Sequence, residues 1–447
     1  MLQFRFSRTR TGKGLFQLLS RSHFPTALES NSLLTFYSIM RRIIYIATVS
    51  LMIAAIFDPL DKIAHLKVPL FVAVCGFCLI RMVITVGRAS LPASLTLYVL
   101  TVAFLIPLLS MCIYFLRNSS NIEYAGLDYL KAYLFLVLSI VLVLSKLDVV
   151  RSLCVILTIL SMLLIGVYFV ATENPTLGDV LVELGNTYGV VGINQRSYGD
   201  LQILGIYFNS SPLLVLPIAY FTYRCVTTRS WSFVVSVGIL AINMVAMIMS
   251  GTRNNMFVGC LTMFVTLVWY SKRKLALILA GTALSTLIAG MEWNVIRAML
   301  SASEGSNAVK LQHVHDYLQI LAEPTTLLIG QGLGAYFNST AYGHTAVTEL
   351  TYLEIVRFYG LMFSVPMFVL LLYPITRLIR SDYRQYHHLY IGYGGYLILC
   401  MANPFLMSSS GMLILSVVIC NAFSFSSTKC PSTASQVARE NRFGFAV

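Results

Sequence analysis

Three arginines and two proton-accepting side chains are the residues of this sequence best suited to chemistry. They lie in polar segments between long apolar runs: Arg196, Arg253, Arg297, His344 and Glu349. Guanidinium groups bind phosphate oxygens through paired hydrogen bonds and keep their charge at every physiological pH. A histidine or a glutamate accepts the proton of an attacking hydroxyl group when it lies within about 3 Å of that group. These residue types indicate a site in which the arginines bind a diphosphate and either His344 or Glu349 activates a hydroxyl group.

The segment "SGTRNN" (250–255) separates two apolar runs and contains no acidic residue. The sequence therefore predicts that Arg253 is a cation without a neighbouring acid, in a tight turn. Such a cation needs an anion to compensate its charge, and a bound phosphate is one candidate. The alternative is that Arg253, like any arginine at a membrane boundary, extends toward the lipid headgroups.

The elements that position these residues are membrane-spanning helices. The chain is 57% hydrophobic and only 11% charged, and its apolar residues form about twelve blocks, each long enough to cross ~30 Å of hydrocarbon as a helix. The blocks are continuous rather than alternating, which excludes a β-barrel. We therefore expect an all-α, polytopic membrane protein with about twelve spans. The blocks lie near residues 35–57, 67–86, 92–116, 129–145, 151–171, 211–223, 231–250, 255–271, 274–290, 351–376, 388–404 and 409–426.

The net charge of +13 follows the membrane topology rather than a polyanionic partner. With the N-terminus in the cytoplasm, most of the basic residues fall on the cytoplasmic side, which is the usual positive-inside bias. We therefore expect the lipid bilayer as the environment of the chain and no nucleic-acid partner. The basic residues that escape the bias are Arg117, Arg196, Arg253, Arg297, Arg357, Lys62, Lys67, Lys131 and Lys310.

The predicted topology divides the chain into a basic cytoplasmic tail (1–33), a membrane domain (34–427) and a second cytoplasmic tail (428–447). Two external loops stand out by their length, 172–210 and 291–350. Long ordered loops on a rigid scaffold are where binding and catalytic residues concentrate, so we expect the site there.

The second loop contains a predicted amphipathic helix over residues 307–324, which ends at Pro324. Its apolar stripe consists of Leu311, Val314, Leu318 and Leu321. We expect this helix to lie on the outer leaflet or over the bundle, with His313 and Asp316 on its solvated face. No cluster of cysteine, histidine and carboxylate has ligand spacing, so no metal and no cofactor is expected.

Two further patterns favour structural roles. "IGQGLG" (329–334) follows no βαβ unit, so we interpret it as a tight turn rather than a nucleotide-binding loop. Glu354 precedes Arg357 by three residues, a spacing at which the two side chains would form an ion pair on a helix.

The order of these motifs resembles that of the O-antigen polymerase and O-antigen ligase superfamily. The resemblance covers roughly residues 190–375 and rests on "SGTR" (250–253), "LLIGQGLG" (327–334), a histidine, and "TELTYLEIVRFYGL" (348–361). It places the family's arginines on Arg253 and Arg297 and its loop-end histidine on His344. Thr345 stands where the ligases have asparagine, so the base remains open between His344 and Glu349.

The resemblance implies a GT-C-like, metal-independent glycosyltransferase of the bacterial inner membrane, with its active site facing the periplasm. Its expected partners are an undecaprenyl-diphosphate-linked glycan donor, an acceptor of the same kind, and a chain-length regulator protein. We expect an O-antigen polymerase that extends the O-antigen of lipopolysaccharide. The first alternative is an O-antigen ligase that transfers the glycan to lipid A-core, and the second is a polysaccharide flippase.

Overall fold

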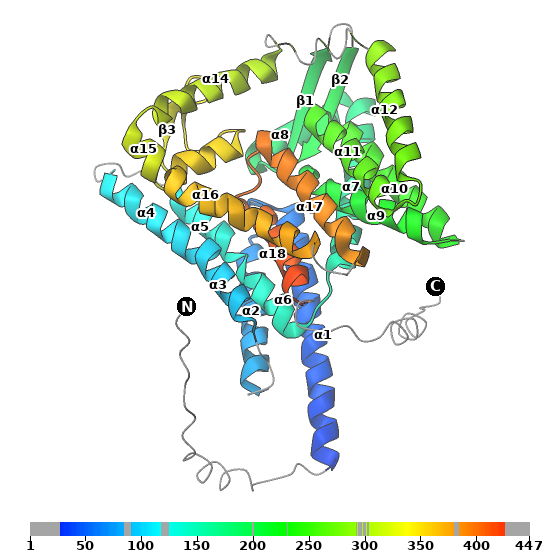
Figure 1. Cartoon of the computed structure of the whole chain (residues 1–447), viewed down its shortest axis with the longest axis vertical. Helices are drawn as coiled ribbons and strands as arrows, with labels where there is room; N and C mark the ends of the chain where they lie inside the picture. The colour runs from blue at the N-terminus through cyan, green and yellow to red at the C-terminus, as the bar shows by residue number, and fades with distance from the viewer. Residues whose placement is uncertain are drawn as a thin grey trace, which may run out of the picture.

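The structure is a computed structural model that describes residues 27–84, 91–117, 125–198, 201–229, 231–291, 304–379 and 384–424, and positions 293, 297 and 301. Its first half contains α1 (Ala27–Phe57), α2 (Lys67–Ile84), α3 (Ala93–Leu100), α4 (Ile106–Arg117), α5 (Gly126–Leu134), α6 (Val137–Ser145), α7 (Val150–Glu173), α8 (Pro175–Tyr188), β1 (Val191–Tyr198) and β2 (Leu201–Phe208) (Figure 1).

The second half is also mainly helical. It contains α9 (Val215–Thr227), α10 (Trp231–Met249), α11 (Arg253–Tyr270), α12 (Lys274–Met291), α14 (Gly305–Leu321), α15 (Pro324–Ile329), β3 (Phe337–Ser339), β4 (Gly343–Thr345), α16 (Thr351–Ile379), α17 (His387–Leu399) and α18 (Ser409–Ser424). The predicted C-terminal tail and residues 1–26 of the predicted N-terminal tail lie outside the described residues.

The architecture is that of a helical membrane protein. Within the described residues, seven segments are long and apolar enough to cross a membrane: 36–57, 67–84, 93–117, 126–145, 150–173, 231–249 and 351–379. Each of the other predicted blocks also forms a helix (α9, α11, α12, α17 and α18), but these helices are shorter or more polar. The helical class is thus confirmed, whereas the number of about twelve spans stays a prediction.

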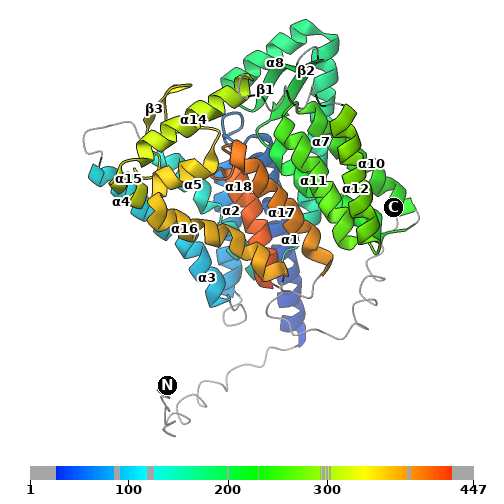
Figure 2. The ribbon, with the colours of Figure 1, turned by 45° about the horizontal axis from the view of Figure 1, so that its top comes forward.

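Both predicted external loops contain regular structure at one end of the molecule. The first loop forms α8 and an antiparallel hairpin in which Val191 pairs with Phe208 and Tyr198 with Leu201. The second contains α14, α15 and the short β3–β4 pair. Figures 1 and 2 show the hairpin and α14 at the end opposite to the one where α1 projects.

The glycines of "IGQGLG" form the turn predicted from the sequence and bring α15 close to the bundle. Gly330, Gly332 and Gly334 all have positive φ values of 82°, 95° and 76°. A Cβ atom on any of the three would lie within 2.4 Å of backbone or Cβ atoms of the neighbouring helices. The turn therefore serves helix packing, because the chain passes where no side chain fits.

The predicted helix of the second loop exists, but its orientation differs from one expectation. Two residues of the predicted apolar stripe of α14, Leu311 and Leu318, are exposed, and the other two, Val314 and Leu321, are half-buried. His313 and Asp316 are buried against the protein instead of solvated, and that expectation was wrong. Their burial depends on partners in the 339–342 segment, which no local pattern in α14 predicts.

Candidate functional site

A cavity of about 1020 Å³ lies between the helical bundle and the second long loop. Its charged lining residues are Lys62, Lys67, Lys131, Arg253, Lys310, Asp61, Asp128 and Glu349. Apolar side chains also line it, among them Val68, Phe71, Leu134, Phe135 and Met407. Basic residues outnumber acidic ones, so the cavity joins a cationic surface to an apolar wall and suits an amphipathic anion.

The cavity is located where α17 stops short. α17 has 13 residues, which span ~20 Å, less than the ~30 Å that a full membrane crossing requires. The chain continues as a short 3-10 turn (Cys400–Ala402) and a non-helical segment up to the start of α18 at Ser409. Residues 402–405 and 407–410 line the cavity. Non-helical backbone and serine side chains therefore form this part of the wall, between the end of α17 and the first residues of α18.

The lysines of the cavity are the ones that escape the cytoplasmic charge bias. All four lysines with a predicted external position, Lys62, Lys67, Lys131 and Lys310, line it. Lys131 pairs with Asp128 at 2.9 Å, and Lys310 Nζ lies 3.7 Å from Glu349 Oε2. The sequence predicted an external position for these four lysines, but nothing in it showed that their side chains line the same cavity.

Arg253 lines the cavity as the first residue of α11. The turn before it requires glycine, because Gly251 has a φ of 65° and its Cα region lies against β2. A Cβ atom on Gly251 would be 2.3 Å from Cα of Gly205. The backbone of Gly251 therefore packs directly on the backbone of Gly205 in β2. This contact fixes the start of α11, where Arg253 lines the cavity.

The expectation that no acid neutralises Arg253 is corrected by the structure. Arg253 Nη2 lies 2.6 Å from Glu304 Oε2 and 3.1 Å from Asn307 Oδ1, and the two charged side chains are only 19% and 15% exposed. Glu304 also accepts a hydrogen bond from the Asn307 backbone N–H at the start of α14. Burial alone raises the pKa of Glu304, but this backbone bond and the guanidinium outweigh burial and lower it. Arg253 therefore also holds α14 to α11.

Glu349 is held by two neighbours at the cavity wall. Tyr342 Oη donates a hydrogen bond to Glu349 Oε1 at 3.0 Å, and Lys310 lies on the other carboxylate oxygen. Burial, followed by the nearby Glu349 carboxylate, raises the pKa of Tyr342, so its hydroxyl stays protonated and able to donate. Of the two predicted bases, Glu349 is the one that the fold places in the cavity.

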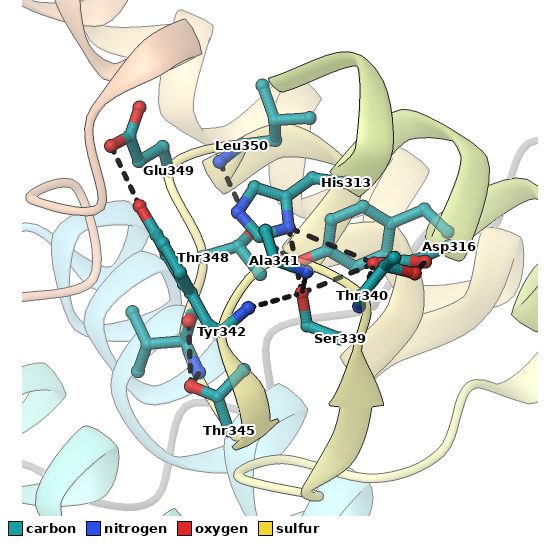
Figure 3. A network of polar contacts seen from close by, with 12 residues as sticks. His313, Asp316, Ser339, Thr340, Ala341, Tyr342, Thr345, Thr348, Glu349 and Leu350 are labelled. Carbon is teal, nitrogen blue, oxygen red and sulfur yellow. Dashed lines mark hydrogen bonds and ion pairs between the residues drawn. The ribbon is translucent and has the colours of Figure 1, made fainter. Parts of the chain in front are cut away.

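Behind Glu349, Tyr342 packs edge-on against the buried ring of His313, with 4.7 Å between the ring centroids (Figure 3). His313 Nδ1 lies 3.1 Å from Ser339 Oγ, which donates to Asp316 Oδ2. Asp316 also accepts the Thr340 backbone N–H at 2.9 Å. Burial raises the pKa of Asp316, but its bonds to Thr340 and Ser339 outweigh burial and lower it. This network fixes the loop that carries Tyr342.

Two of the other predicted site residues, His344 and Arg297, do not line the cavity. His344 is exposed in β4, with Nδ1 3.1 Å from Asn338 Oδ1 and its ring stacked on Tyr336. Arg297 is exposed and does not line the cavity. Arg196 lies in β1 opposite Ile203, and its side chain is outside the description. Of the four predicted site residues whose side chains the structure describes, Arg253 and Glu349 line the cavity.

Glu354 and Arg357 are buried close to each other, but Arg357 has other partners. Arg357 Nη2 lies 4.0 Å from Glu354 Oε1, whereas the guanidinium donates to Gln331 Oε1 and to the carbonyls of Ala335 and Ala346. Arg357 therefore links α16 to the segments on both sides of β3 and β4. The predicted pair of Glu354 and Arg357 is thus present at 4.0 Å, and the hydrogen bonds of Arg357 to the loop segments are additional contacts that the sequence did not predict.

Comparison with protein-family models and with curated proteins yields no match for this sequence.

Proposed function

We propose that the protein is a membrane-embedded glycosyltransferase that joins undecaprenyl-diphosphate-linked glycan units, as an O-antigen polymerase does at the periplasmic face of the bacterial inner membrane. The observation that supports this most is the cavity, in which Arg253 and lysines from three helices and the α1–α2 connection border an apolar wall. A polyprenyl diphosphate has both an anionic head and an apolar chain, and this lining is complementary to both.

The chemistry divides between the cations and the carboxylate. Glu349 takes the proton of the acceptor hydroxyl, and the resulting nucleophilic oxygen attacks the anomeric carbon of the donor sugar. The bond between that carbon and the diphosphate oxygen breaks, and its electron pair leaves with undecaprenyl diphosphate. Arg253 and Lys310 stabilise the charge that develops on this leaving group, which is where prearranged cations act most effectively.

Glu349 is assigned as the base in preference to His344. A general base must reach the hydroxyl within about 3 Å, and Glu349 lines the cavity whereas His344 does not. The hydrogen bond from Tyr342 and the ion pair with Lys310 leave the Glu349 carboxylate partly exposed, at 35% of its side-chain surface.

A transporter is the second candidate, because helices break where they border the cavity. Phe135, at the break between α5 and α6, and the segment between α17 and α18 both line it. Broken helices at a central site are common in transporters. Purified protein in vesicles discriminates the two: a transferase releases polyprenyl diphosphate and lengthens the glycan, whereas a flippase moves the lipid without changing it.

The direct test is the polysaccharide ladder of cells that carry Arg253→Ala, Arg253→Lys or Glu349→Gln. Arg117→Ala is the matched control, because Arg117 forms a similar pair with Glu323 at 2.9 Å but does not line the cavity. We expect short or absent ladders for the Arg253 and Glu349 variants and a normal ladder for the control. Normal ladders for Arg253→Ala at normal protein level would refute the proposed function.

The same strains separate polymerase from ligase. Loss of a polymerase leaves a single repeat unit on the lipid A-core, whereas loss of a ligase leaves none. We expect the single unit in a deletion strain, and a core without any unit would assign the ligase reaction instead.

A further inference from the structure

Lys67 is a buried basic residue on the cavity wall. It is the first residue of α2 and only 8% exposed. Its ammonium group donates to the Pro59 carbonyl at 2.5 Å and to Ser409 Oγ at 3.1 Å. In the described part of the chain no ion pair joins Lys67 to a carboxylate. An ammonium group has three donors, and these two neutral acceptors use two of them.

The acids nearest in sequence are occupied by the backbone. Asp58 accepts the N–H groups of Lys62, Ile63 and Ala64 at 2.9–3.0 Å, and Asp61 accepts the N–H of Lys67 itself at 3.1 Å. Burial raises the pKa of Asp58, but the three backbone bonds and the nearby Lys67 ammonium outweigh burial and lower it. These carboxylates shape the α1–α2 connection and attract the Lys67 ammonium electrostatically, but their hydrogen bonds to the backbone keep them in the connection while Lys67 lines the cavity.

The N-terminus of α18 meets Lys67 at the same place. Ser408, Ser409 and Ser410 all line the cavity, and α18 continues from there for 16 residues. Ser408 Oγ accepts the Gly411 N–H at 3.1 Å, which is the bond of an N-cap. The first N–H groups of a helix have no partner within the helix, and the helix dipole adds positive potential there. Such an end binds phosphate groups.

We propose that Lys67 and the N-terminus of α18 form a second phosphate-binding subsite. It uses different elements from Arg253 and Lys310, which belong to α11 and α14. Val68 and Phe71, in the first turn of α2, line the cavity beside Lys67. The ligand is therefore a phosphate or diphosphate group attached to an apolar chain.

The subsite gives the two cationic regions of the cavity separate tasks. Transfer between two lipid-linked glycans requires two diphosphates to be held at once, one that leaves and one that stays. We assign the staying diphosphate, that of the acceptor, to Lys67 and α18. The identity of this second ligand rests on the proposed function, whereas the phosphate subsite itself does not.

The test counts bound ligands with variants that differ only in charge. Ser408→Asp keeps an N-cap as effective as serine and adds a negative charge at the subsite, and Ser408→Asn is the neutral control. Lys67→Met removes the cation, and exposed Lys272→Met, outside the cavity, is its control. The purified chain is studied in dodecyl maltoside, which carries no phosphate, with farnesyl diphosphate or inorganic pyrophosphate as the probe in equilibrium dialysis.

We expect wild type, Ser408→Asn and Lys272→Met to bind two equivalents of farnesyl diphosphate. We expect Ser408→Asp and Lys67→Met to bind the second equivalent at least about 10-fold more weakly. Because Ser408→Asp retains the cap, unchanged binding of two equivalents by this variant would overturn the subsite. Pyrophosphate binding as tight as that of farnesyl diphosphate would overturn the assignment to a lipid-linked ligand.

The outcome is independent of catalysis. A wild-type chain that binds two equivalents but transfers no sugar would refute the proposed function and retain the subsite. A chain that transfers sugar while Ser408→Asp and Lys67→Met bind normally would refute the subsite alone.

Discussion

Arg253 and Glu304 are 51 residues apart in the chain, yet Nη2 of the arginine lies 2.6 Å from Oε2 of the glutamate. The pair connects the first residue of α11 to the residue that caps α14. It ties the second long loop to the bundle directly at the cavity wall. One guanidinium therefore contributes both to the position of the loop and to the charge of the site.

Glu304→Gln removes this charge pair and keeps an acceptor oxygen. We expect it to lower the free energy of unfolding at pH 7 by about 1.5–3 kcal/mol, the range for hydrogen bonds to charged groups. The folded-state pKa of Glu304 is lowered, so its contribution is complete above the ordinary value of 4.5. The contribution is lost as the pH falls below that value and through the lowered pKa.

The measurement is thermal unfolding of the purified chain at pH 7 and pH 3.5, where the difference between wild type and Glu304→Gln should shrink. Asp128→Asn is the control, because its pair with Lys131 at 2.9 Å is exposed on both sides and exposed pairs contribute little. A Glu304→Gln variant as stable as wild type at pH 7 would contradict the role of the pair in holding α14 to α11.

Tyr342→Phe tests whether Tyr342 positions Glu349. The variant removes the donor at 3.0 Å and keeps the ring that packs on His313. We expect kcat to fall about 10-fold with KM unchanged, a fraction of the 10²–10⁴-fold typical of a whole general base. Tyr336→Phe, whose ring stacks on His344 away from the cavity, should leave both constants unchanged. A rise in KM alone would show that Tyr342 binds substrate instead.

Gly251→Ala tests the packing of the "SGTR" turn on β2. A Cβ atom at Gly251 would lie 2.3 Å from Cα of Gly205, and the backbone has a φ of 65°. We expect a lower Tm together with loss of activity, because the start of α11 must move and carries Arg253 with it. Gly238→Ala in α10 is the control, since nothing lies within 4 Å of its Cβ and alanine favours a helix. Equal Tm values for the two variants would contradict the close contact.

The sequence predicted the parts of this fold that depend on local pattern. The apolar blocks became helices and the "IGQGLG" turn became a turn. These features are predictable because the length of an apolar run and the position of glycine act locally.

What the sequence did not predict depends on contacts between distant segments. Glu304 reaches Arg253, and Ser339 reaches His313, only after the second long loop has folded over the bundle. The hairpin at 191–208 was also missed, because its glycines suggested an irregular loop. His344 fits a catalytic role by residue type, but β4 holds it in an exposed position outside the cavity.

His313 makes the folded state sensitive to mild acid. Its ring is fully buried, and burial lowers its pKa although the carboxylates of Glu349 and Asp316 act in the opposite direction. The unfolded chain therefore takes up a proton near pH 6.5 and the folded chain does not, so stability is complete above that pH and declines below it. Thermal unfolding at pH 7.5 and 5.5 should show a smaller decrease for His313→Gln than for wild type, whereas exposed His315→Gln should behave like wild type. An identical decrease in all three proteins would remove His313 as the source of the acid sensitivity.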